Sequence, residues 1–293
     1  MQEHVRFDYS PIAERPKWQL PKGARVAVWV IPNIEHFLFD RPSTSITPMT
    51  TSLVPDILNY SWRDYGARVG VWRMMDTMEK YGIRGTAALN ADVCERYPQI
   101  IEAGNRLGWE WMGHGKNNSQ LLTDMEPEQE RELIRDVVET ITEGTGKKPR
   151  GWLSPALTET HNTPDLLVEN GIEYVGNWVN DEQPYPMKVK KGSLYSIPYS
   201  IEVNDIPVFL DGRKMGGEFQ QIICDTFDVL YEDGKTSGRV MAIALHPFLV
   251  GHPHRAKYLD QALKHISARQ DVWFATGSEI IDWYKKTSAQ TAT

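Results

Sequence analysis

The sequence has few cysteines and no long hydrophobic run. Only two of its 293 residues are cysteines, Cys94 and Cys224, and their spacing predicts neither a metal-ligand pair nor a disulfide framework. No run approaches the roughly 18 apolar residues that a membrane span needs. The polar start MQEHVRFDYS does not resemble a secretory signal. We therefore expect a protein of the reducing cytoplasm that has no membrane partner.

The sequence also lacks an excess of positive charge and the common nucleotide-binding motifs. Its net charge of −7 argues against a nucleic-acid partner. It contains no dinucleotide-binding glycine fingerprint and no phosphate loop. The segment ATGSEI is only a weak match to the phosphate-binding loop of sugar-phosphate barrel enzymes. With 41% hydrophobic residues and no break in composition, the chain is expected to form one domain over residues 1–293.

Apolar runs alternate with amphipathic segments along the chain. Strands are predicted at 24–31, 84–90, 109–114, 149–155, 172–179, 238–247 and 271–276, and helices at 68–82, 92–108, 125–146, 163–171, 254–269 and 277–286. This alternation is typical of a parallel sheet, either a barrel or a doubly wound sheet. Residues 1–23 are expected to form an N-terminal arm, and the segment 32–65, rich in Pro, Ser and Thr, a long active-site or interface loop. The tail 287–293 is expected to fray.

Polar side chains gather where the predicted strands end. They are Glu35, His36, His114, Ser154, Thr158 to Thr160, Asn177, Asn180, Asp181 and His246. The carboxyl ends of parallel strands share one face of the sheet, and active sites lie on that face. A lone histidine at a strand end is more often a hydrogen-bonded structural residue than a ligand. A carboxylate such as Glu35 directly after a buried strand is unfavourable unless it is paired, hydrogen-bonded or ligating.

Other polar residues have both a structural and a functional interpretation. Any one of three arginines could bind an anion or simply form an ion pair: Arg63, Arg68 and Arg73. His252 and His254 lie close to His246 in the loop HPFLVGHPHR, where exposure or a bond to a backbone carbonyl is the simpler expectation. The segment SIEVND, residues 200–205, favours a turn capped by its own side chains.

Several motifs together resemble one known family. An acidic residue follows the first strand, HGKNNS follows the third, and RGWLSP, NDEQP and LHP come later in the chain. This order resembles the NodB-type polysaccharide deacetylase superfamily. The segments YGARVGVWR, GWLSPALTET, IPYSIEVND and HPFLVGHPHR are more similar to its metal-independent branch of allantoinase-like enzymes and cyclic imide hydrolases. The resemblance runs from about residue 24 to 284. It implies a distorted (β/α)7-8 barrel, hydrolysis of a C–N bond, and a homo-oligomer, either a dimer or a tetramer.

The chain departs from the deacetylase pattern at two positions. The family's paired aspartates fall near Ile34, Glu35 and His36, so one carboxylate remains. The second metal-binding histidine falls near Asn118, whereas the final histidine, a general acid in the family, is kept as His246. Zinc usually needs three protein ligands. Either Glu35 and His114 hold a weakly bound divalent metal such as zinc, helped by His36 or by the amide oxygen of Asn118, or no metal binds.

Without a metal, the substrate must carry an activated carbonyl. In this hypothesis Glu35 activates water, His246 or His114 protonates the leaving nitrogen, and donors near Ser154 hold the oxyanion. We predict a hydrolase that opens a small cyclic imide or a ureide such as allantoin. The residues predicted to contact the substrate are Asn118, Ser154, Trp178, Asp181 and Arg73. The alternatives are a metal-dependent deacetylase of an N-acetylated sugar and a non-catalytic member that binds a ligand.

Overall fold

One nine-stranded, mostly parallel sheet organises the computed structural model, which describes residues 5–41, 49–123 and 125–291. The strand order is β6-β7-β5-β4-β3-β2-β1-β8, and β9 pairs with the first half of β1. The strands are β1 Val26–Ile34, β2 Thr86–Leu89, β3 Glu110–Gly113, β4 Gly151–Trp152, β5 Tyr174–Val175, β6 Tyr185–Met187, β7 Leu194–Ser196, β8 Arg239–Leu245 and β9 Val272–Phe274. Among the strands of the described residues, only β6 and β7 pair in antiparallel fashion.

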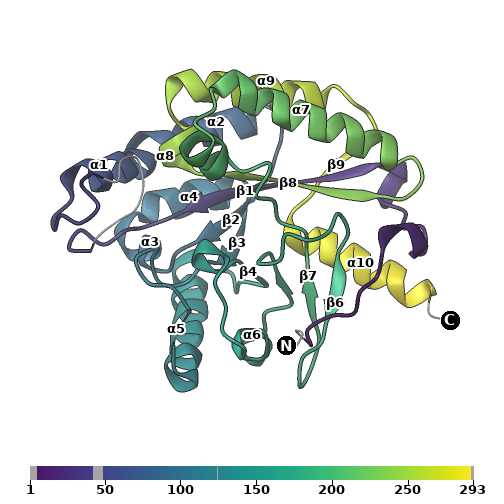
Figure 1. Cartoon of the computed structure of the whole chain (residues 1–293), viewed down its shortest axis with the longest axis horizontal. Helices are drawn as coiled ribbons and strands as arrows, with labels where there is room; N and C mark the ends of the chain where they lie inside the picture. Colours follow the sequence, from purple (N-terminus) through teal and green to yellow (C-terminus); the bar gives the residue numbers. More distant parts are fainter. Residues whose placement is uncertain (1–4, 42–48, 124, 292–293) are drawn as a thin grey trace.

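The sheet curls until its two ends approach each other. The free edge of β8 accepts no further strand, but Val240 donates its N–H to the carbonyl of Glu182, and Ala244 donates to Val203. These bonds link β8 to the segments that flank β6 and β7 at the other end of the sheet. Figure 1 shows the long β1 and β8 crossing the molecule side by side, with the shorter strands turning away below them. The predicted distorted barrel is confirmed as a curled half-barrel.

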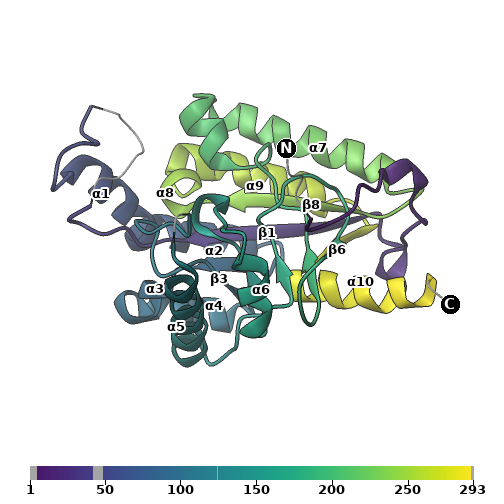
Figure 2. The ribbon, with the colours of Figure 1, turned by 60° about the horizontal axis from the view of Figure 1, so that its bottom comes forward.

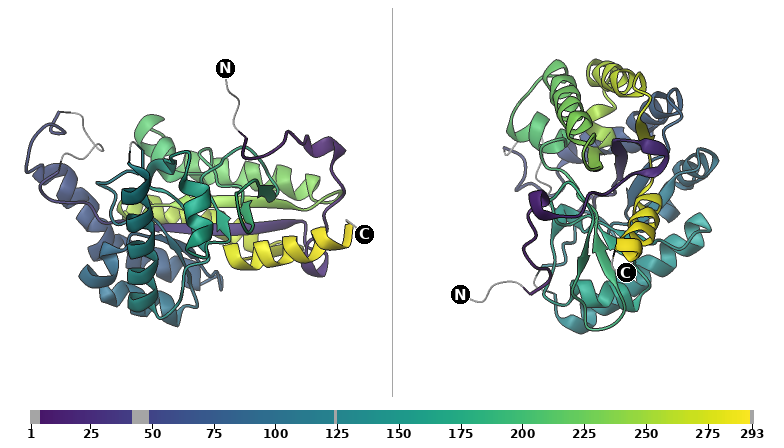
Figure 3. Two further views of the ribbon diagram at one scale, coloured as in Figure 1. Left: turned by 90° about the horizontal axis from the view of Figure 1, so that it is seen from below. Right: turned by 90° about the vertical axis from the view of Figure 1, so that its right-hand side faces the viewer.

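Helices surround the sheet. They are α1 Ile57–Tyr65, α2 Val71–Glu79, α3 Asp92–Arg96, α4 Pro98–Arg106, α5 Pro127–Thr145, α6 Thr163–Glu169, α7 Gly216–Asp233, α8 Pro247–Val250, α9 Pro253–Ser267 and α10 Gly277–Thr291. Helix α10 packs with the side chains inside the curl, through Ile280 and Ile281. In Figure 2, α7 and α9 lie on one side of β1 and β8, and α5 lies on the other side. Short helical turns are η1 Ile12–Glu14, η2 Pro21–Gly23, η3 Gly66–Gly70, η4 Pro155–Leu157 and η5 Pro207–Asp211. Figure 3 places α1 and the end of α10 at opposite ends of the molecule.

The sequence pattern of β1 explains how both faces of the sheet are filled. Every residue of β1 is buried, and successive side chains point to opposite faces. Ala27, Trp29 and Ile31 pack inside the curl, where Trp29 meets Tyr174 edge-on with 6.3 Å between ring centroids. The alternate residues, such as Val28, pack outward against the helices. A continuous apolar run is therefore what a strand covered on both faces requires.

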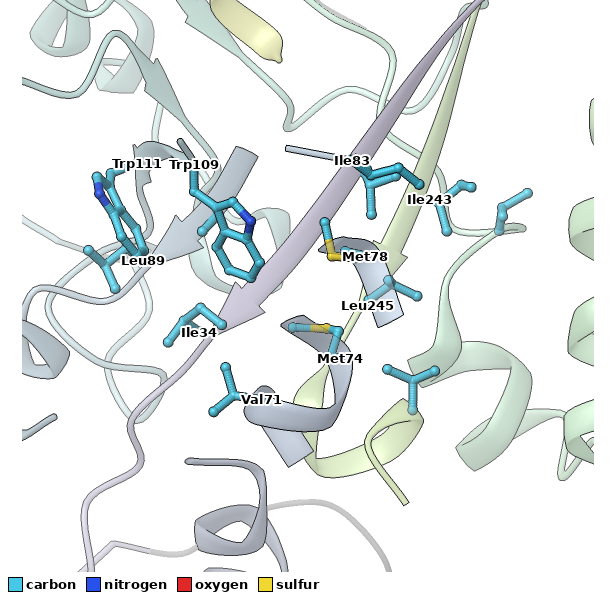
Figure 4. Close-up of a cluster of buried hydrophobic side chains, with 14 of the residues drawn as sticks. Ile34, Val71, Met74, Met78, Ile83, Leu89, Trp109, Trp111, Ile243 and Leu245 are labelled. Carbon is cyan, nitrogen blue, oxygen red and sulfur yellow. The ribbon is translucent and has the colours of Figure 1, made fainter. Parts of the chain in front are cut away.

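The outward cluster fixes α2 over the ends of two central strands. Figure 4 shows Val71, Met74 and Met78 of α2 facing Ile34 at the end of β1 and Leu245 at the end of β8. All five side chains are at most 4% exposed. At roughly 1.5–3 kcal/mol for each fully buried aliphatic side chain, this cluster contributes strongly to holding the segments that follow β1 and β8 in place.

Several predicted boundaries are wrong. The expected loop 32–65 is shorter, because β1 continues to Ile34 and α1 already begins at Ile57; residues 42–48 lie outside the described part. The expected frayed tail is helical as far as Thr291, and residues 292–293 are not described. Helix α7 and the β6–β7 pair were not predicted at all. The N-terminal arm contains the turns η1 and η2, and buries Trp18 and Leu20 against α10 and the sheet.

In the part of the chain that the structure describes, no helix combines the length and the apolar character that crossing a membrane requires.

Candidate active site

Four neighbouring strand ends bring the polar residues together. In the sheet order β3-β2-β1-β8, these strands are followed by His114, Asn90, Glu35 and His246 respectively. Oε1 of Glu35 lies 3.4 Å from Nε2 of His114 and 3.6 Å from Nε2 of His246. The three side chains are only 3–5% exposed. The two histidines thus meet at Oε1 of Glu35, although the three residues are 79 or more positions apart in the sequence.

Both histidines are oriented through their other ring nitrogen. Nδ1 of His114 bonds to the carbonyl oxygen of Leu153, and Nδ1 of His246 bonds to Oδ1 of Asp205 at 2.6 Å. A carbonyl and a carboxylate only accept hydrogen bonds, so each Nδ1 carries the proton. The second oxygen of Asp205 accepts the backbone N–H of His246 at 2.8 Å. Nε2 of each ring is thereby directed at Glu35.

The charges of this group support one another in a buried environment. Burial alone would raise the pKa of Glu35, but the positive charge of His246, the interaction with His114 and the charge of Arg63 outweigh this effect and lower that pKa. Burial alone would lower the pKa of His246, but Asp205 and Glu35 outweigh it and raise that pKa. Burial raises the pKa of Asp205 despite its bond to His246. The surroundings therefore favour the carboxylate form of Glu35 and the charged form of His246.

A chain of amide hydrogen bonds fixes the orientation of Asn118. The backbone N–H of His36 donates to Oδ1 of Asn90 at 2.9 Å, so the Nδ2 group of Asn90 must face the other way. It donates to the carbonyl of His114 and, at 3.0 Å, to Oδ1 of Asn118. The Nδ2 group of Asn118 then donates to Oε1 of Glu35 at 2.5 Å. Asn118 is consequently a donor toward Glu35, and its oxygen is engaged elsewhere.

The predicted metal ligands do not form a three-ligand site. Glu35 and His114 are adjacent, but Asn118 presents N–H groups rather than its oxygen to them. An N–H group cannot coordinate a cation. His36, the predicted helper, bonds through Nδ1 to the hydroxyl of Tyr97 at 3.3 Å. Within residues 5–41, 49–123 and 125–291, no three His, Cys, Asp or Glu side chains are arranged to hold an ion. The donor set therefore does not fit a zinc ion.

A close backbone contact holds the segment that follows His246. A Cβ atom on Gly70 would lie 2.1 Å from the carbonyl oxygen of Pro247, so only glycine allows η3 to approach α8 this closely. Arg73 donates to the carbonyl of Gly251 and, at 3.1 Å, to the hydroxyl of Tyr65. His252 stacks on Tyr65 with 4.2 Å between the ring centroids. These contacts give Arg73 and His252 a positioning role for the His246 loop, outside the group around Glu35.

Three other predicted contact residues take part in separate interactions. Ser154 is fully buried; its backbone N–H donates to Asn177, and its hydroxyl oxygen accepts from the indole of Trp152 at 2.9 Å. Trp178 packs edge-on against Phe7 of the N-terminal arm, 5.0 Å between centroids. Asp181 forms a two-pronged salt bridge with Arg15 of the same arm, at 2.6 and 2.7 Å. The structure connects none of the three to Glu35 by a contact among the described residues.

Sequence reasoning missed three residues that the structure brings to the group. Asp205 was assigned to a self-capped turn; its neighbour Asn204 does cap Ile206, but Asp205 binds His246. Asn90 directly follows β2, and its place after a strand was the only feature in the sequence that pointed to a role in the site. Arg63 was weighed with two other arginines, of which Arg73 was preferred. Listing the polar residue that follows every predicted strand would have included Asn90 among the candidate site residues.

The family match agrees with this arrangement. Residues 60–175 match the family described as polysaccharide deacetylase. This match spans less than half of the chain, and a solved structure described as a probable polysaccharide deacetylase shares the fold over 93% of it. Hydrolysis of a carbon–nitrogen bond by a deacetylase-type enzyme is supported at this level. The resemblance inferred from the sequence motifs is thus confirmed for the family.

Two named relatives align with most of the chain. The chain is 28% identical over 234 residues to a putative polysaccharide deacetylase of Schizosaccharomyces pombe, and the alignment spans 74% of this chain and 73% of the relative. It is 24% identical over 260 residues to a peptidoglycan deacetylase of Helicobacter pylori, covering 76% and 86% of the two chains.

Two solved structures superpose on nearly the whole chain. A probable polysaccharide deacetylase from Pseudomonas aeruginosa has a TM-score of 0.83 at 27% identity, covering 93% of this chain and 95% of that one. Puue allantoinase has a TM-score of 0.85 at 26% identity, covering 96% and 99%. Proteins named as deacetylases and a protein named as an allantoinase therefore share this fold.

Proposed function

We propose that the protein opens a C–N bond of a small cyclic amide, a cyclic imide or a ureide, with Glu35 as general base and His246 as general acid. One observation carries this proposal: Oε1 of Glu35 lies between Nε2 of His114 and Nε2 of His246, at 3.4 and 3.6 Å. A carboxylate whose pKa is lowered and an imidazole whose pKa is raised are suited to act as a base and an acid.

In the first step, Glu35 removes a proton from water as the water oxygen bonds to the scissile carbonyl carbon. Glu35 lines a small cavity of about 10 Å³, close to the volume that one water requires. Among the described residues, its Oε2 atom has no hydrogen-bond partner. A buried carboxylate oxygen without a protein partner is well suited to hold the attacking water, because an unsatisfied buried acceptor is unfavourable.

In the second step, the C–N bond breaks and Nε2 of His246 gives its proton to the leaving nitrogen. Asp205 holds the ring through Nδ1 and stabilises its positive charge. The proton that Glu35 took from water then returns to His246 across the 3.6 Å contact. The products are a carboxylic acid, which ionises, and the freed N–H of the opened ring. Water is consumed and both residues regain their starting charges.

We propose that this reaction proceeds without a resident metal. The support is the hydrogen-bond chain through Asn90, which turns the N–H groups of Asn118 toward Glu35. Cyclic imides and ureides suit this chemistry, since their carbonyls are more electrophilic than that of a simple amide. His114 is assigned to orient Glu35 by its contact at Nε2.

The enclosure of the group supports a small substrate. Glu35, His114 and His246 are each at most 5% exposed. A polymer must reach a catalytic group through an open groove, whereas a small molecule binds with most of its surface enclosed. The high structural similarity to Puue allantoinase is in keeping with a ureide or a related ring.

A second candidate is the deacetylation of an N-acetylated sugar. The names of the Schizosaccharomyces and Helicobacter relatives favour it. It predicts stoichiometric metal in the purified protein and the release of acetate. A non-catalytic role in ligand binding is the third alternative, and it predicts no turnover of any amide.

A panel of substrates distinguishes these candidates. Succinimide, glutarimide, hydantoin, dihydrouracil, allantoin and oligomers of N-acetylglucosamine are incubated with protein whose metal content is measured by mass spectrometry. We expect turnover of at least one cyclic amide, unchanged after treatment with a chelator. Turnover of the sugar oligomers alone, lost on chelation, would replace our proposal with the second candidate.

We also propose that the protein is a cytoplasmic homo-oligomer, either a dimer or a tetramer. Large apolar side chains on and just before α1 are exposed to solvent: Phe39, Met49, Leu53, Val54, Ile57 and Leu58. Such clustering is typical of surfaces that are covered in an assembly. Light scattering coupled to size-exclusion chromatography measures the mass directly, and a monomer at micromolar concentration would contradict the proposal.

A further inference from the structure

The peptide group between Leu153 and Ser154 lies just beyond the end of β4 and connects two buried side chains. Its carbonyl oxygen accepts Nδ1–H of His114, and its N–H donates to Oδ1 of Asn177 at 2.7 Å. The strands β4 and β5 have both ended before this point, so side chains take the places that backbone partners occupy within the sheet. The N–H of Ser154, one of the donors predicted to hold the oxyanion, is therefore engaged by Asn177 instead.

The partners of the Asn177 amide allow it only one direction. Its Nδ2 group donates to Oε1 of Glu159 at 2.6 Å and to Oγ of Ser154 at 3.0 Å. The carboxyl oxygen of Glu159 needs a donor and the N–H of Ser154 needs an acceptor, so a flipped amide would lose its bonds to both groups. Asn177 and Ser154 are buried, and a polar group that loses its partner in such a place is costly.

Glu159 ends this chain of hydrogen bonds at a partly exposed position after β4. Burial raises the pKa of Glu159, and the hydrogen bond from Asn177 acts in the opposite direction. An acceptor oxygen remains whether the carboxyl is charged or protonated. The direction of the Asn177 amide, and with it the orientation of the peptide group, therefore does not depend on the charge of Glu159.

The same chain determines which ring nitrogen of His114 carries the proton. Because Nδ1 faces a carbonyl oxygen, the proton is on Nδ1. In the neutral ring Nε2 then has only a lone pair, and it lies 3.4 Å from Oε1 of Glu35. Nδ1 of His246 faces the carboxylate of Asp205 instead, at 2.6 Å. The two rings beside Glu35 are thus held by partners of different charge, one neutral and one negative.

We propose that Asn177 and Glu159 are positioning residues that fix His114 with its proton on Nδ1 and with Nε2 as a hydrogen-bond acceptor beside Glu35. This inference rests on the proposed function and deepens it. An Nε2 atom without a proton has none to give, so the protonation of the leaving nitrogen falls to His246. Without the Asn177 amide, the peptide group can turn its N–H toward Nδ1 of His114, and the tautomer with the proton on Nε2 becomes favourable.

The direct test identifies the tautomer by NMR of protein that contains isotope-labelled histidine. Long-range correlations between ring nitrogens and ring protons show which nitrogen of a neutral imidazole carries its proton, and the signals missing from His114→Gln assign this ring. We expect the proton on Nδ1 in the wild type and in Glu159→Gln, which keeps an acceptor oxygen for Asn177. In Asn177→Leu and, to a smaller extent, in Glu159→Leu, we expect the form with the proton on Nε2 to appear.

The matched control is Asn105→Leu. The amide of Asn105 also bonds to two groups, the carbonyl of Thr145 at 3.0 Å and the indole of Trp111 at 2.9 Å, but near the start of β3 rather than at its end. Its loss should leave the His114 tautomer unchanged. A change in Asn177→Leu that the control does not show is one that a merely structural role would not produce.

Kinetics on the best cyclic amide of the panel provide a second measurement. We expect Asn177→Leu to lose about 10- to 100-fold in kcat, the range found when a partner that orients a metal-bound histidine is removed, with little change in KM. Glu159→Gln should stay close to the wild type.

The tautomer is measured without substrate, so this inference and the proposed function can fail separately. A wild-type His114 ring with its proton on Nε2, or with protons on both nitrogens at every pH tested, would overturn the inference. One tautomer shared by the wild type, Asn177→Leu and Glu159→Leu would overturn it as well. The expected tautomers in a wild type that opens no cyclic amide would overturn the proposed function alone. If Asn177→Leu does not fold, Glu159→Leu and Glu159→Gln, at a partly exposed position, give the same comparison.

Discussion

Asn118 donates its side-chain amide to Oε1 of Glu35 across 2.5 Å. The position at which the sequence resemblance places a metal-binding histidine therefore contributes a hydrogen-bond donor to the proposed general base. The donor is fixed, because Asn90 occupies the amide oxygen of Asn118 from the opposite side. Asn118 therefore provides a hydrogen bond that favours the ionised form of Glu35, in place of a metal ligand.

Replacing Asn118 by aspartate is expected to shift the acidic limb of the pH profile. The new carboxylate would lie beside Glu35, and like charges at this distance disfavour ionisation of both groups. The pKa of Glu35, lowered in the wild type, should therefore rise. We expect kcat/KM at mildly acidic pH to fall and to recover partly as the pH is raised.

The matched control is Asn180→Asp. Asn180 is exposed, and its side-chain oxygen accepts the hydroxyl of Tyr185 at 2.8 Å, a bond that aspartate can keep. Its pH profile should match that of the wild type. An acidic limb that is the same in the wild type, Asn118→Asp and the control would mean that Glu35 does not govern this limb.

Replacing Glu35 by glutamine should abolish most of the activity. The amide cannot accept a proton from water, and a general base contributes roughly 100- to 10,000-fold to the rate. We expect a loss within or above this range, with circular dichroism unchanged at room temperature. Glu102→Gln, at an exposed position of α4, serves as the control. A Glu35→Gln variant with wild-type kcat would remove this residue from the mechanism.

The Asp205–His246 pair predicts the alkaline limb of the same profile. The pKa of His246 is raised, so the protonated acid is present below that raised pKa and is lost as the pH rises through it. In Asp205→Asn one amide oxygen must replace two acceptor oxygens, while both the backbone N–H and Nδ1–H of His246 need acceptors. We expect the alkaline limb to move to lower pH and kcat to fall by about 100-fold or more.

A second histidine–aspartate pair offers a control for this change. Nε2 of His265 lies 2.8 Å from Asp228 on the surface, far from any predicted role in catalysis. Asp228→Asn should leave the pH profile unaltered. If Asp205→Asn shifts neither limb relative to this control, His246 is not the general acid.

The contact between η3 and α8 predicts a coupled loss of stability and activity. In Gly70→Ala the added methyl group would meet the carbonyl of Pro247 at 2.1 Å, and overpacking of this kind costs about 1–3 kcal/mol. Because Pro247 directly follows His246, we also expect kcat to fall. Urea denaturation measures the free energy of unfolding, and steady-state kinetics measures the effect on turnover.

Gly217 provides the matching substitution in α7. A Cβ atom there would lie 3.5 Å from the ring of Tyr258, an ordinary contact, and alanine favours a helix by up to about 1 kcal/mol over glycine. Gly217→Ala should therefore be neutral or slightly stabilising, with unchanged kcat. Equal stability of the two variants would show that α8 can move away from η3 without penalty.

The strand pattern and the ends of the central strands could be predicted because both depend on local sequence. A strand that is covered on both faces must be apolar at every position, as β1 and β8 are, and the polar residue that follows it marks its end. Parallel pairing then predicts that Glu35, His114 and His246 lie on one side of the sheet. Helix α7 was missed because no strong local signal marked its first turn, where two glycines begin the helix.

Other features depend on the tertiary structure alone. Asp205 lies 41 positions before His246, and nothing in SIEVND distinguishes a residue that binds a histidine from one that caps a turn. That Arg63 lines the cavity beside Glu35, whereas Arg73 does not, depends on how α1 and α2 pack on the sheet. The direction of the Asn118 amide depends on Asn90, at the end of a different strand.

The sequence by itself determined the class of fold, the family and the two residues that carry most of the proposed chemistry, Glu35 and His246. It did so because burial and strand direction follow from patterns a few residues long. Only the tertiary structure decided which atoms of these residues face each other, and that Asn118 offers N–H groups rather than an oxygen. Hydrogen-bond direction depends on every partner in a network, and those partners come from β1, β2 and β3, segments distant in the sequence.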